Sequence, residues 1–187
     1  MDIKAQIIVF IKIIVAVILI GIFAQIEIEL PLNEAGISIS GQTFAVLLVG
    51  FLLGSNLGSL AIILYTIVGV MGAPVFSGGA SGVETFLGPS MGYLVGFVLG
   101  AYVAGRLAER GWHDKLWKCI IVMMIGTFGI LFCGVIRLTF IFGIETSLEV
   151  GMYPFLSGGL IKTTLGGLVA YFIYPLFNKQ GMFSSSK

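Results

Sequence analysis

Long apolar runs, separated by short polar or glycine-rich segments, make up most of the chain. A helix that crosses the hydrocarbon core of a bilayer needs about 20 apolar residues. The second and third runs are short for a full crossing, so the pattern leaves open whether residues 42–71 span the membrane or form a re-entrant hairpin. The apolar runs predict six helices, at about residues 3–28, 42–53, 57–71, 90–107, 116–140 and 154–177.

Composition supports the membrane interpretation. Hydrophobic residues make up 58% of the chain and charged residues only 10%, whereas a typical soluble domain is about 25% charged. A soluble fold with so few charged residues could not cover its surface with polar groups. The sequence therefore predicts an all-α membrane protein, a bundle of six transmembrane helices, with residues 1–187 forming one integral-membrane substrate-binding domain.

Charged residues predict the orientation of this bundle in the cell membrane. Lysine and arginine occur near the N-terminus, after the sixth run and between the fourth and fifth runs, where Arg106, Arg110, Lys115 and Lys118 cluster. The positive-inside rule then predicts a multi-pass protein with both termini in the cytoplasm. The segments expected on the opposite side carry carboxylates, namely Glu27, Glu29, Glu34, Glu84, Glu145 and Glu149.

Glycines recur at four-residue spacing in two of the predicted helices. Residues four apart lie on the same face of a helix, so each series forms a smooth groove for a neighbouring helix. We expect these grooves to serve packing within the chain, with a dimer interface as the alternative. The two series are Gly50, Gly54 and Gly58, and Gly92, Gly96 and Gly100.

Motifs of catalysis and metal binding are missing from the sequence. It contains no phosphate-binding G-x-x-x-x-G-K-[ST] loop, no His-Glu-x-x-His and no Cys/His cluster with zinc spacing. The one histidine, His113, lies in the charged linker, where we expect it to be solvated. The net charge of +1 gives no reason to expect a nucleic-acid partner. The sequence thus predicts neither an enzyme nor a metal protein, and active transport would need energy from another subunit.

Two cations stand in apolar surroundings, Arg137 near the outer end of the fifth run and Lys162 in the sixth. A charge deep in a bilayer costs at least about 3 kcal/mol, so it normally faces the protein interior or a water-filled cavity. Arg137 either contacts a ligand or extends to the interface, where Glu145 or Glu149 could pair with it. Lys162 is deeper, and we interpret it as part of a ligand site.

Nearly the whole chain resembles the BioY family, the biotin-binding S components of energy-coupling-factor (ECF) transporters, and the most specific part of the resemblance lies in its first half. The match is continuous from Ile39 to Phe97 and includes QTFAVLLVGFLLG (42–54), GAPVFSGG (72–79) and LGPSMGYLVGF (87–97). The resemblance implies an S component of six helices, with outward loops folded over a biotin pocket. It also implies that the chain itself holds no cofactor and that its partners are a membrane-embedded T component and two ATPase subunits, which bind ATP.

Specific residues follow from the same resemblance. On the first helix, the small residues Ala16, Gly21 and Ala24 are an imperfect version of the Ala-x-x-x-Ala pattern that the family presents to the T component. We expect a cavity between Phe76, Tyr93 and Lys162, roofed by the glycine-rich loop 74–82. The residues expected near the ligand are Gln42, Phe76, Ser77, Gly79, Tyr93, Arg137, Tyr153 and Lys162.

Two positions depart from the family pattern. Gly159 stands where the family usually carries an aspartate, and Arg137 stands where it often carries an aromatic or apolar residue. Together these changes would make the pocket more positive. They leave two alternatives to a biotin-capturing S component: an S component for a different small organic anion, or a membrane assembly protein without a ligand.

Overall fold

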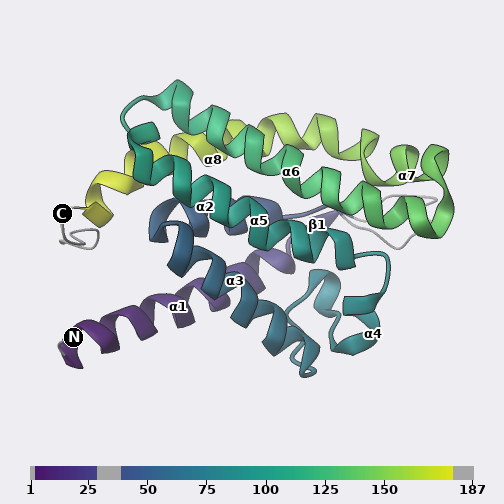
Figure 1. Ribbon diagram of the computed structural model, residues 1–187, viewed down its shortest axis with the longest axis horizontal. Coiled ribbons are helices and arrows are strands. Elements are labelled where there is room, and N and C mark those ends of the chain that lie inside the picture. Colours follow the sequence, from purple (N-terminus) through teal and green to yellow (C-terminus); the bar gives the residue numbers. More distant parts are fainter. Residues whose placement is uncertain (1–2, 29–38, 179–187) are drawn as a thin grey trace.

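The protein is described here by a computed structural model, which covers residues 3–28 and 39–178 (Figure 1). Most of this part of the chain is helical. A pair of two-residue strands, β1 (Glu27–Ile28) and β2 (Ile39–Ser40), is antiparallel, with Glu27 opposite Ser40. The α-helices are α1 (Ile3–Ala24), α2 (Gln42–Leu53), α3 (Ser55–Val70), α4 (Gly82–Leu87), α5 (Met91–Leu107), α6 (Leu116–Phe142), α7 (Ile144–Gly151) and α8 (Tyr153–Asn178).

The six predicted helices correspond to α1, α2, α3, α5, α6 and α8, with ends that differ by a few residues. The largest difference is at the end of α1, because residues 27–28 leave the helix to pair as β1. Two further helices, α4 and α7, were not predicted. They have six and eight residues and mixed polarity, so they lack the long apolar signature on which the prediction relied.

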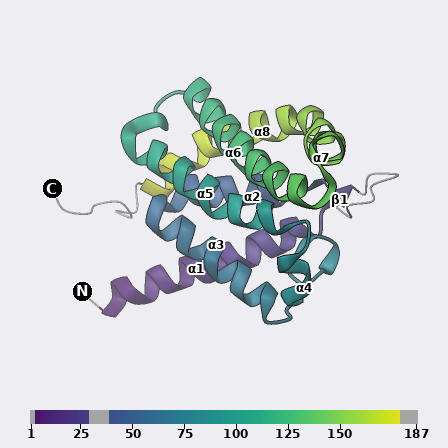
Figure 2. The same cartoon turned by 45° about the vertical axis from the view of Figure 1, so that its right-hand side comes forward.

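Four segments of the described chain are long and apolar enough to cross a membrane: Ile3–Ala24, Met91–Trp112, Leu116–Phe142 and Gly159–Phe177. The helices α2 and α3 are shorter, with 12 and 16 residues. They meet at Gly54, whose φ of 84° lies in the left-handed region that favours glycine. In two views, α5 and α6 run side by side, with α8 behind α6. The helices α1 and α3 lie on the other side of α5 from α6 (Figures 1 and 2).

The turn between α2 and α3 is fixed to the end of α5. Glu109, in the π-helical turn Ala108–Trp112 (η2), accepts hydrogen bonds from the backbone N–H of Ser55 at 2.7 Å and from its hydroxyl at 3.0 Å. The carboxylate thus binds free N–H groups in the first turn of α3, where negative charge is favourable. Both short helices therefore reach the level at which α5 ends.

His113 follows this turn and is not simply solvated, as the sequence suggested. Its ring stacks on Tyr174 of α8, with 4.1 Å between the ring centroids. Burial beside this ring lowers the pKa of His113 below its ordinary value, because the charged imidazolium loses solvation. The linker between α5 and α6 is therefore packed against the C-terminal half of α8.

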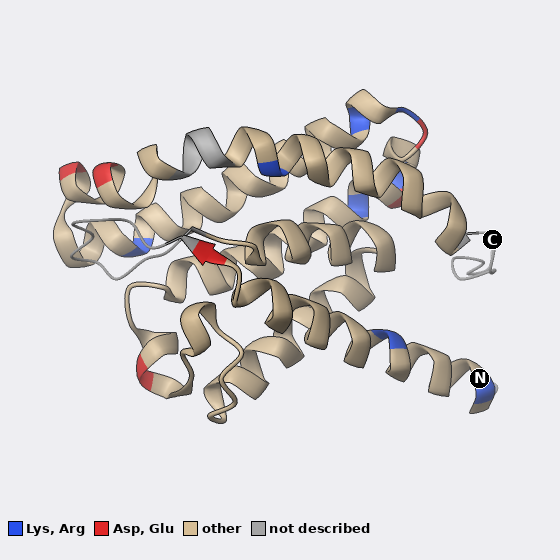
Figure 3. Ribbon diagram, turned by 180° about the vertical axis from the view of Figure 1, so that it is seen from behind, with Lys and Arg blue, Asp and Glu red and all other residues tan. Residues whose placement is uncertain are grey.

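Charge is separated along the molecule (Figure 3). Carboxylates on β1, α4 and α7 lie toward one end, whereas most lysines and arginines lie toward the end where α1 begins and α8 finishes. At that second end, Glu109 and Asp114 pair with Arg106 at 3.3 Å and Lys118 at 2.8 Å. Four charged residues used in the orientation argument lie outside the described residues: Glu29, Glu34, Lys179 and Lys187.

Both glycine series are packed inside the chain. A Cβ on Gly50 would lie 2.6 Å from the Cα of Ala101 on α5, and one on Gly58 would lie 2.7 Å from the Cα of Gly50. A Cβ on Gly96 would lie 3.0 Å from the Cα of Ile130 on α6. Close backbone approach of this kind is what small residues permit between membrane helices. The interpretation as packing within the chain is confirmed at these positions.

We predict that Gly50→Ala lowers the thermal stability of the purified protein, because the added methyl group would overlap backbone atoms of α5. Overpacking of this kind costs about 1–3 kcal/mol. Gly129→Ala is the matched control, since nothing lies within 4 Å of its position on α6. Thermal unfolding in detergent should show a lower Tm for Gly50→Ala and an equal or higher Tm for Gly129→Ala. Equal effects of the two changes would contradict the packing described here.

Candidate functional site

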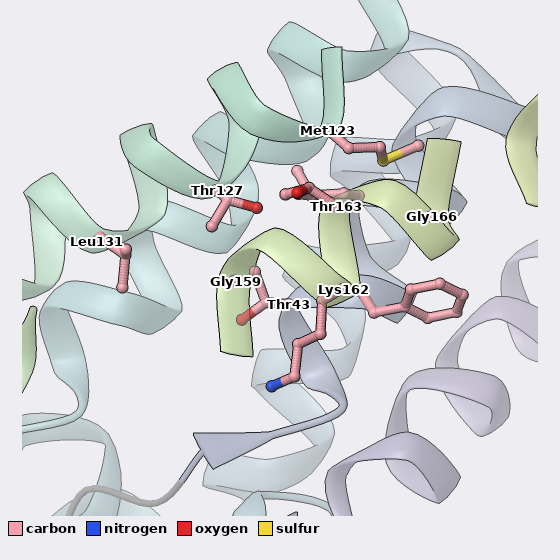
Figure 4. A pocket seen from close by; sticks show the side chains of 10 residues that line it. Thr43, Met123, Thr127, Leu131, Gly159, Lys162, Thr163 and Gly166 are labelled. Carbon is pink, nitrogen blue, oxygen red and sulfur yellow. The ribbon is translucent and has the colours of Figure 1, made fainter. Parts of the chain in front are cut away.

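A hollow lies between α2, α6 and α8 (Figure 4). Its empty volume is about 410 Å³, which includes space open to the exterior. Apolar side chains, three threonines, two glycines and one lysine form its walls. The lining residues are Thr43, Phe44, Leu47, Met123, Thr127, Leu131, Gly159, Lys162, Thr163 and Gly166.

Lys162 is the one charged residue in this lining. Its side chain is half-buried, and its ammonium group donates a hydrogen bond to the backbone carbonyl of Ser40, at 2.7 Å. Figure 4 shows the side chain extending from α8 toward the strand. Within the described residues, Lys162 forms no ion pair with a carboxylate. Among the described residues this half-buried cation is held by a neutral carbonyl, an environment that favours an anionic group beside it.

The rest of the lining is shaped by small and hydroxyl-bearing residues. Gly159 and Gly166 are seven residues apart, so they lie on the same face of α8 and leave space there. A Cβ on Gly159 would approach only Thr127, at 4.0 Å. Thr127 and Thr163 point into the space between α6 and α8 (Figure 4), and the Thr163 hydroxyl donates to the carbonyl of Leu160 on its own helix. Its oxygen still has lone pairs that could accept a hydrogen bond.

Gln42, expected at the ligand, instead has its side chain within the protein. It is 6% exposed, and its amide oxygen accepts a hydrogen bond from the Ser40 hydroxyl at 2.8 Å. Its amide nitrogen donates to the hydroxyl of Tyr65 at 2.6 Å. The neighbouring Thr43, rather than Gln42, lines the hollow. The side chain of Gln42 thus points to Tyr65 of α3, and a role of Gln42 at the ligand stays a prediction.

The glycine-rich loop packs beside α1 and α3. Phe76 is 3% exposed, and its ring meets that of Tyr65 edge-on, with 5.8 Å between the centroids. The Ser77 hydroxyl donates to the carboxylate of Glu27 on β1, at 2.8 Å. Gly79 has a φ of 74° within the turn. None of these loop residues lines the hollow. The group that contacts Lys162, in place of the expected loop, is the carbonyl of Ser40.

The two tyrosines expected at the ligand do not line this hollow either. The hydroxyl of Tyr93 donates to the carbonyl of Gly151 at the end of α7, at 2.8 Å, and the ring packs against Gly134 of α6. Tyr153 is 58% exposed at the start of α8. The hollow that contains Lys162 is therefore not the space between Phe76, Tyr93 and Lys162 that the sequence suggested.

Arg137 binds the backbone at the end of α4 and does not line the hollow. Its guanidinium donates to the carbonyls of Leu87, at 2.6 Å, and Gly88, at 3.5 Å, at the C-terminal end of α4. The pairing with Glu145 or Glu149 considered from the sequence is not found among the ion pairs of the described chain. Cations are favourable at a helix C-terminus, where carbonyl groups lack partners.

The small residues of α1 face the bundle instead of a free surface. Ala16 is 4% exposed and Ala24 is fully buried, and a Cβ on Gly21 would lie 3.7 Å from Val75. The chain itself covers Ala16 and Ala24, whereas Gly21 is half-buried, and the assignment of these residues to partner binding stays a prediction. The exposed face of α1 consists of large apolar side chains, including Ile7, Ile11, Ile14, Ile18 and Ile22.

The threonines of the hollow were missed in the sequence. A threonine in an apolar helix usually returns its hydrogen bond to its own backbone, so Thr43, Thr127 and Thr163 carried little individual signal. Their common feature is that each lies in an apolar run, and Thr163 adjoins Lys162. Only the packing of α2, α6 and α8 brings them together.

The apolar helices and the lysine-containing hollow define a polytopic α-helical membrane protein with a candidate site for a small molecule. Comparison with known proteins is more specific: the BioY family model matches residues 1–179. The chain belongs to the BioY family.

Named relatives and a solved structure agree with this assignment. The biotin transporter BioY of Thermotoga maritima is 35% identical over 145 residues, which cover 76% of this chain and 83% of the relative. The biotin transporter BioY of Rhizobium etli is 30% identical over 176 residues, 85% of this chain and 94% of the relative. A crystal structure of the S-component for biotin from an ECF-type ABC transporter aligns with a TM-score of 0.81. It covers 95% of this chain and 98% of its own at 24% identity, so it bears on the fold alone.

We predict that Arg137→Ala loosens α4 without unfolding the bundle. Charge-assisted hydrogen bonds are worth about 1.5–3 kcal/mol when buried and less at a half-exposed position such as this one. Hydrogen–deuterium exchange should become faster in residues 82–88. Arg110→Ala, an exposed arginine in η2, is the control and should leave that exchange unchanged. Arg137→Lys should restore protection only in part, because one ammonium group cannot reproduce the forked contact with both carbonyls.

Proposed function

We propose that this protein is the substrate-capturing S component of an ECF-type importer and that its substrate is biotin. The observation that carries the proposal is Lys162, a half-buried cation without a carboxylate partner in the described chain, on the wall of a hollow. The relatives named biotin transporters, which match most of the chain, supply the identity of the ligand.

The composition of the hollow suits a ligand with one anionic end and an apolar body. Lys162 and Thr163 provide a cation and a hydroxyl, whereas Phe44, Leu47 and Met123 provide apolar walls. Biotin has a carboxylate, an aliphatic tail and a polar ureido ring. We assign its carboxylate to Lys162, because a charge-assisted hydrogen bond there would replace the weaker one to the Ser40 carbonyl. Discrimination would rest on polar groups that a wrong ligand leaves unpaired.

The remaining features of the proposal concern the assembly. Six membrane helices are formed by the four long spans together with α2 and α3, and the whole chain is one domain. Both termini lie in the cytoplasm, which is supported by the lysines and arginines that gather toward the end of the molecule where α1 begins and α8 finishes (Figure 3). A T component and two ATPase subunits act as partners. They supply the energy of ATP hydrolysis, for which this chain has no phosphate-binding loop motif.

A different small organic anion is the second candidate ligand, and it is favoured by one observation. Gly159 contributes no side chain to the wall, so the described lining contains a lysine and no carboxylate. Arg137 no longer supports this alternative, since it binds the carbonyls of α4. A panel of vitamins and small carboxylic acids in a thermal-shift assay would separate the two candidates, because the true ligand should raise the Tm most.

We predict that Lys162→Met weakens biotin binding by at least about tenfold, the effect of losing one charge-assisted hydrogen bond. Isothermal titration calorimetry of the purified protein is the measurement. Biotinamide, which lacks the negative charge, should bind the unaltered protein more weakly than biotin does, and Lys162→Met should not distinguish the two ligands. Lys115→Ala, at an exposed lysine directly before α6 that does not line the hollow, is the control and should bind biotin normally.

Two results would count against this assignment. Failure of the unaltered protein to bind biotin at micromolar concentration would remove biotin as the substrate, although not membership of the family. A persistent preference for biotin over biotinamide in Lys162→Met would show that another group binds the carboxylate.

A further inference from the structure

A series of hydrogen bonds, joined at Ser40 through its backbone carbonyl and its side-chain hydroxyl, runs from Lys162 to the glycine-rich loop. Lys162 donates to the carbonyl of Ser40, and the hydroxyl of Ser40 donates to the amide oxygen of Gln42. Gln42 donates to the hydroxyl of Tyr65, which donates to the carbonyl of Val75 at 2.7 Å. The series therefore joins α8 to β2, α2, α3 and the loop, and its largest step in the sequence is the one from Lys162 to Ser40.

The direction of each bond is fixed from the loop end. The Val75 carbonyl can only accept, so the single hydroxyl proton of Tyr65 must point to it. Tyr65 must then accept from Gln42, which turns the amide nitrogen of Gln42 toward Tyr65 and its oxygen toward Ser40. The backbone N–H of Gln42 also donates to the Ser40 hydroxyl, at 3.4 Å. No member can reverse its bond without leaving a buried neighbour unsatisfied.

Burial makes the series rigid. Ser40 is 7% exposed, Gln42 is 6% exposed and Tyr65 is fully buried. Among the described residues, no buried side-chain nitrogen or oxygen lacks a hydrogen-bond partner. Polar groups in such an environment have no water to replace a lost partner, so the members hold one another in place.

The loop has further ties on the same side of the molecule. Gln25 donates to the carbonyl of Phe76 at 3.3 Å, and Ser77 donates to Glu27. The Phe76 ring fills the space left by Gly69 on α3, beside Tyr65. Tyr65 therefore contacts the loop through its ring and its hydroxyl, while Gln42 connects it to the strand that binds Lys162.

We propose that Gln42 and Tyr65 are positioning residues, which set the orientation of the Lys162 ammonium group in the hollow and couple it to closure of the loop 75–80. An anion that draws the Lys162 ammonium group toward itself weakens the hydrogen bond to the Ser40 carbonyl at one end of the series. Loosening of the loop at the other end withdraws the same support from Lys162. The role in ligand capture rests on the proposed function, whereas the coupling itself is a property of the chain without ligand.

The coupling is tested first without ligand. Tyr65→Phe removes one hydroxyl and keeps the ring that packs on Phe76, and Tyr102→Phe, at an exposed tyrosine of α5, is the matched control. The first measurement is the rate at which an amine-reactive reagent labels Lys162, followed by mass spectrometry. The second is hydrogen–deuterium exchange of residues 75–80. We expect both rates to rise severalfold in Tyr65→Phe and to stay unchanged in Tyr102→Phe.

Gln42→Glu provides a second variant of nearly the same shape. A carboxylate cannot donate, so Tyr65 would have to give its proton to it and release Val75. We expect faster exchange in residues 75–80 for this variant as well. A folded Tyr65→Phe or Gln42→Glu protein, shown by an unchanged far-ultraviolet circular dichroism spectrum, with unaltered labelling of Lys162 and unaltered loop exchange would overturn the proposal.

Binding then distinguishes positioning from contact. Tyr65→Phe should release biotin about tenfold faster, the effect of about one hydrogen bond, while biotin and biotinamide keep their relative affinities because Lys162 still meets the ligand. If the unaltered protein binds no biotin, the labelling and exchange results still decide the coupling. A normal release rate together with faster loop exchange would show that the loop does not retain the ligand, and would overturn the capture role of this series.

Discussion

The ammonium group of Lys162 lies among apolar helices, where a charge is tolerated only if other groups of the protein or a ligand solvate it. The carbonyl of Ser40 supplies this contact, and it can do so because the short strands β1 and β2 hold the start of α2 beneath α8. The strand pair places Ser40, whose hydroxyl donates to the buried amide of Gln42, and that amide donates in turn to the hydroxyl of Tyr65.

Close helix packing makes this arrangement rigid. Glycines let α2 approach both α3 and α5, and they let α5 approach α6, at distances that a methyl group would prevent. Gly159 and Gly166 of α8 face the hollow, where the nearest atoms opposite them belong to side chains. Gly167 of the same helix instead approaches α6 closely, since a Cβ there would lie 2.7 Å from the Cα of Ile120. The same residue type therefore either permits close packing or leaves space. Which of the two occurs depends on what lies opposite each glycine.

The sequence was sufficient for the helices but not for the site. Apolar length located the six long or moderately long helices within a few residues, because burial in lipid imposes a strong and local pattern. Lys162 was found for a similar reason, as a charge in an apolar run. The sequence did not show where Gln42, Phe76 and Tyr93 point, since that is decided by contacts with Tyr65, Gly69 and Gly151 from other helices. Arg137 was ambiguous because its partners are backbone carbonyls, which carry no sequence signal.

The position of the hollow bears on how the loop could act on a ligand. The loop touches α1 and α3, whereas the hollow lies between α2, α6 and α8. Direct coverage of the ligand would require the loop to leave these contacts and move toward the hollow. Coupling through Ser40, Gln42 and Tyr65 requires no such movement, because these residues already connect both sides of α2. A chain with few charged groups can therefore transmit the state of one cation through neutral side chains, provided that each remains buried and paired.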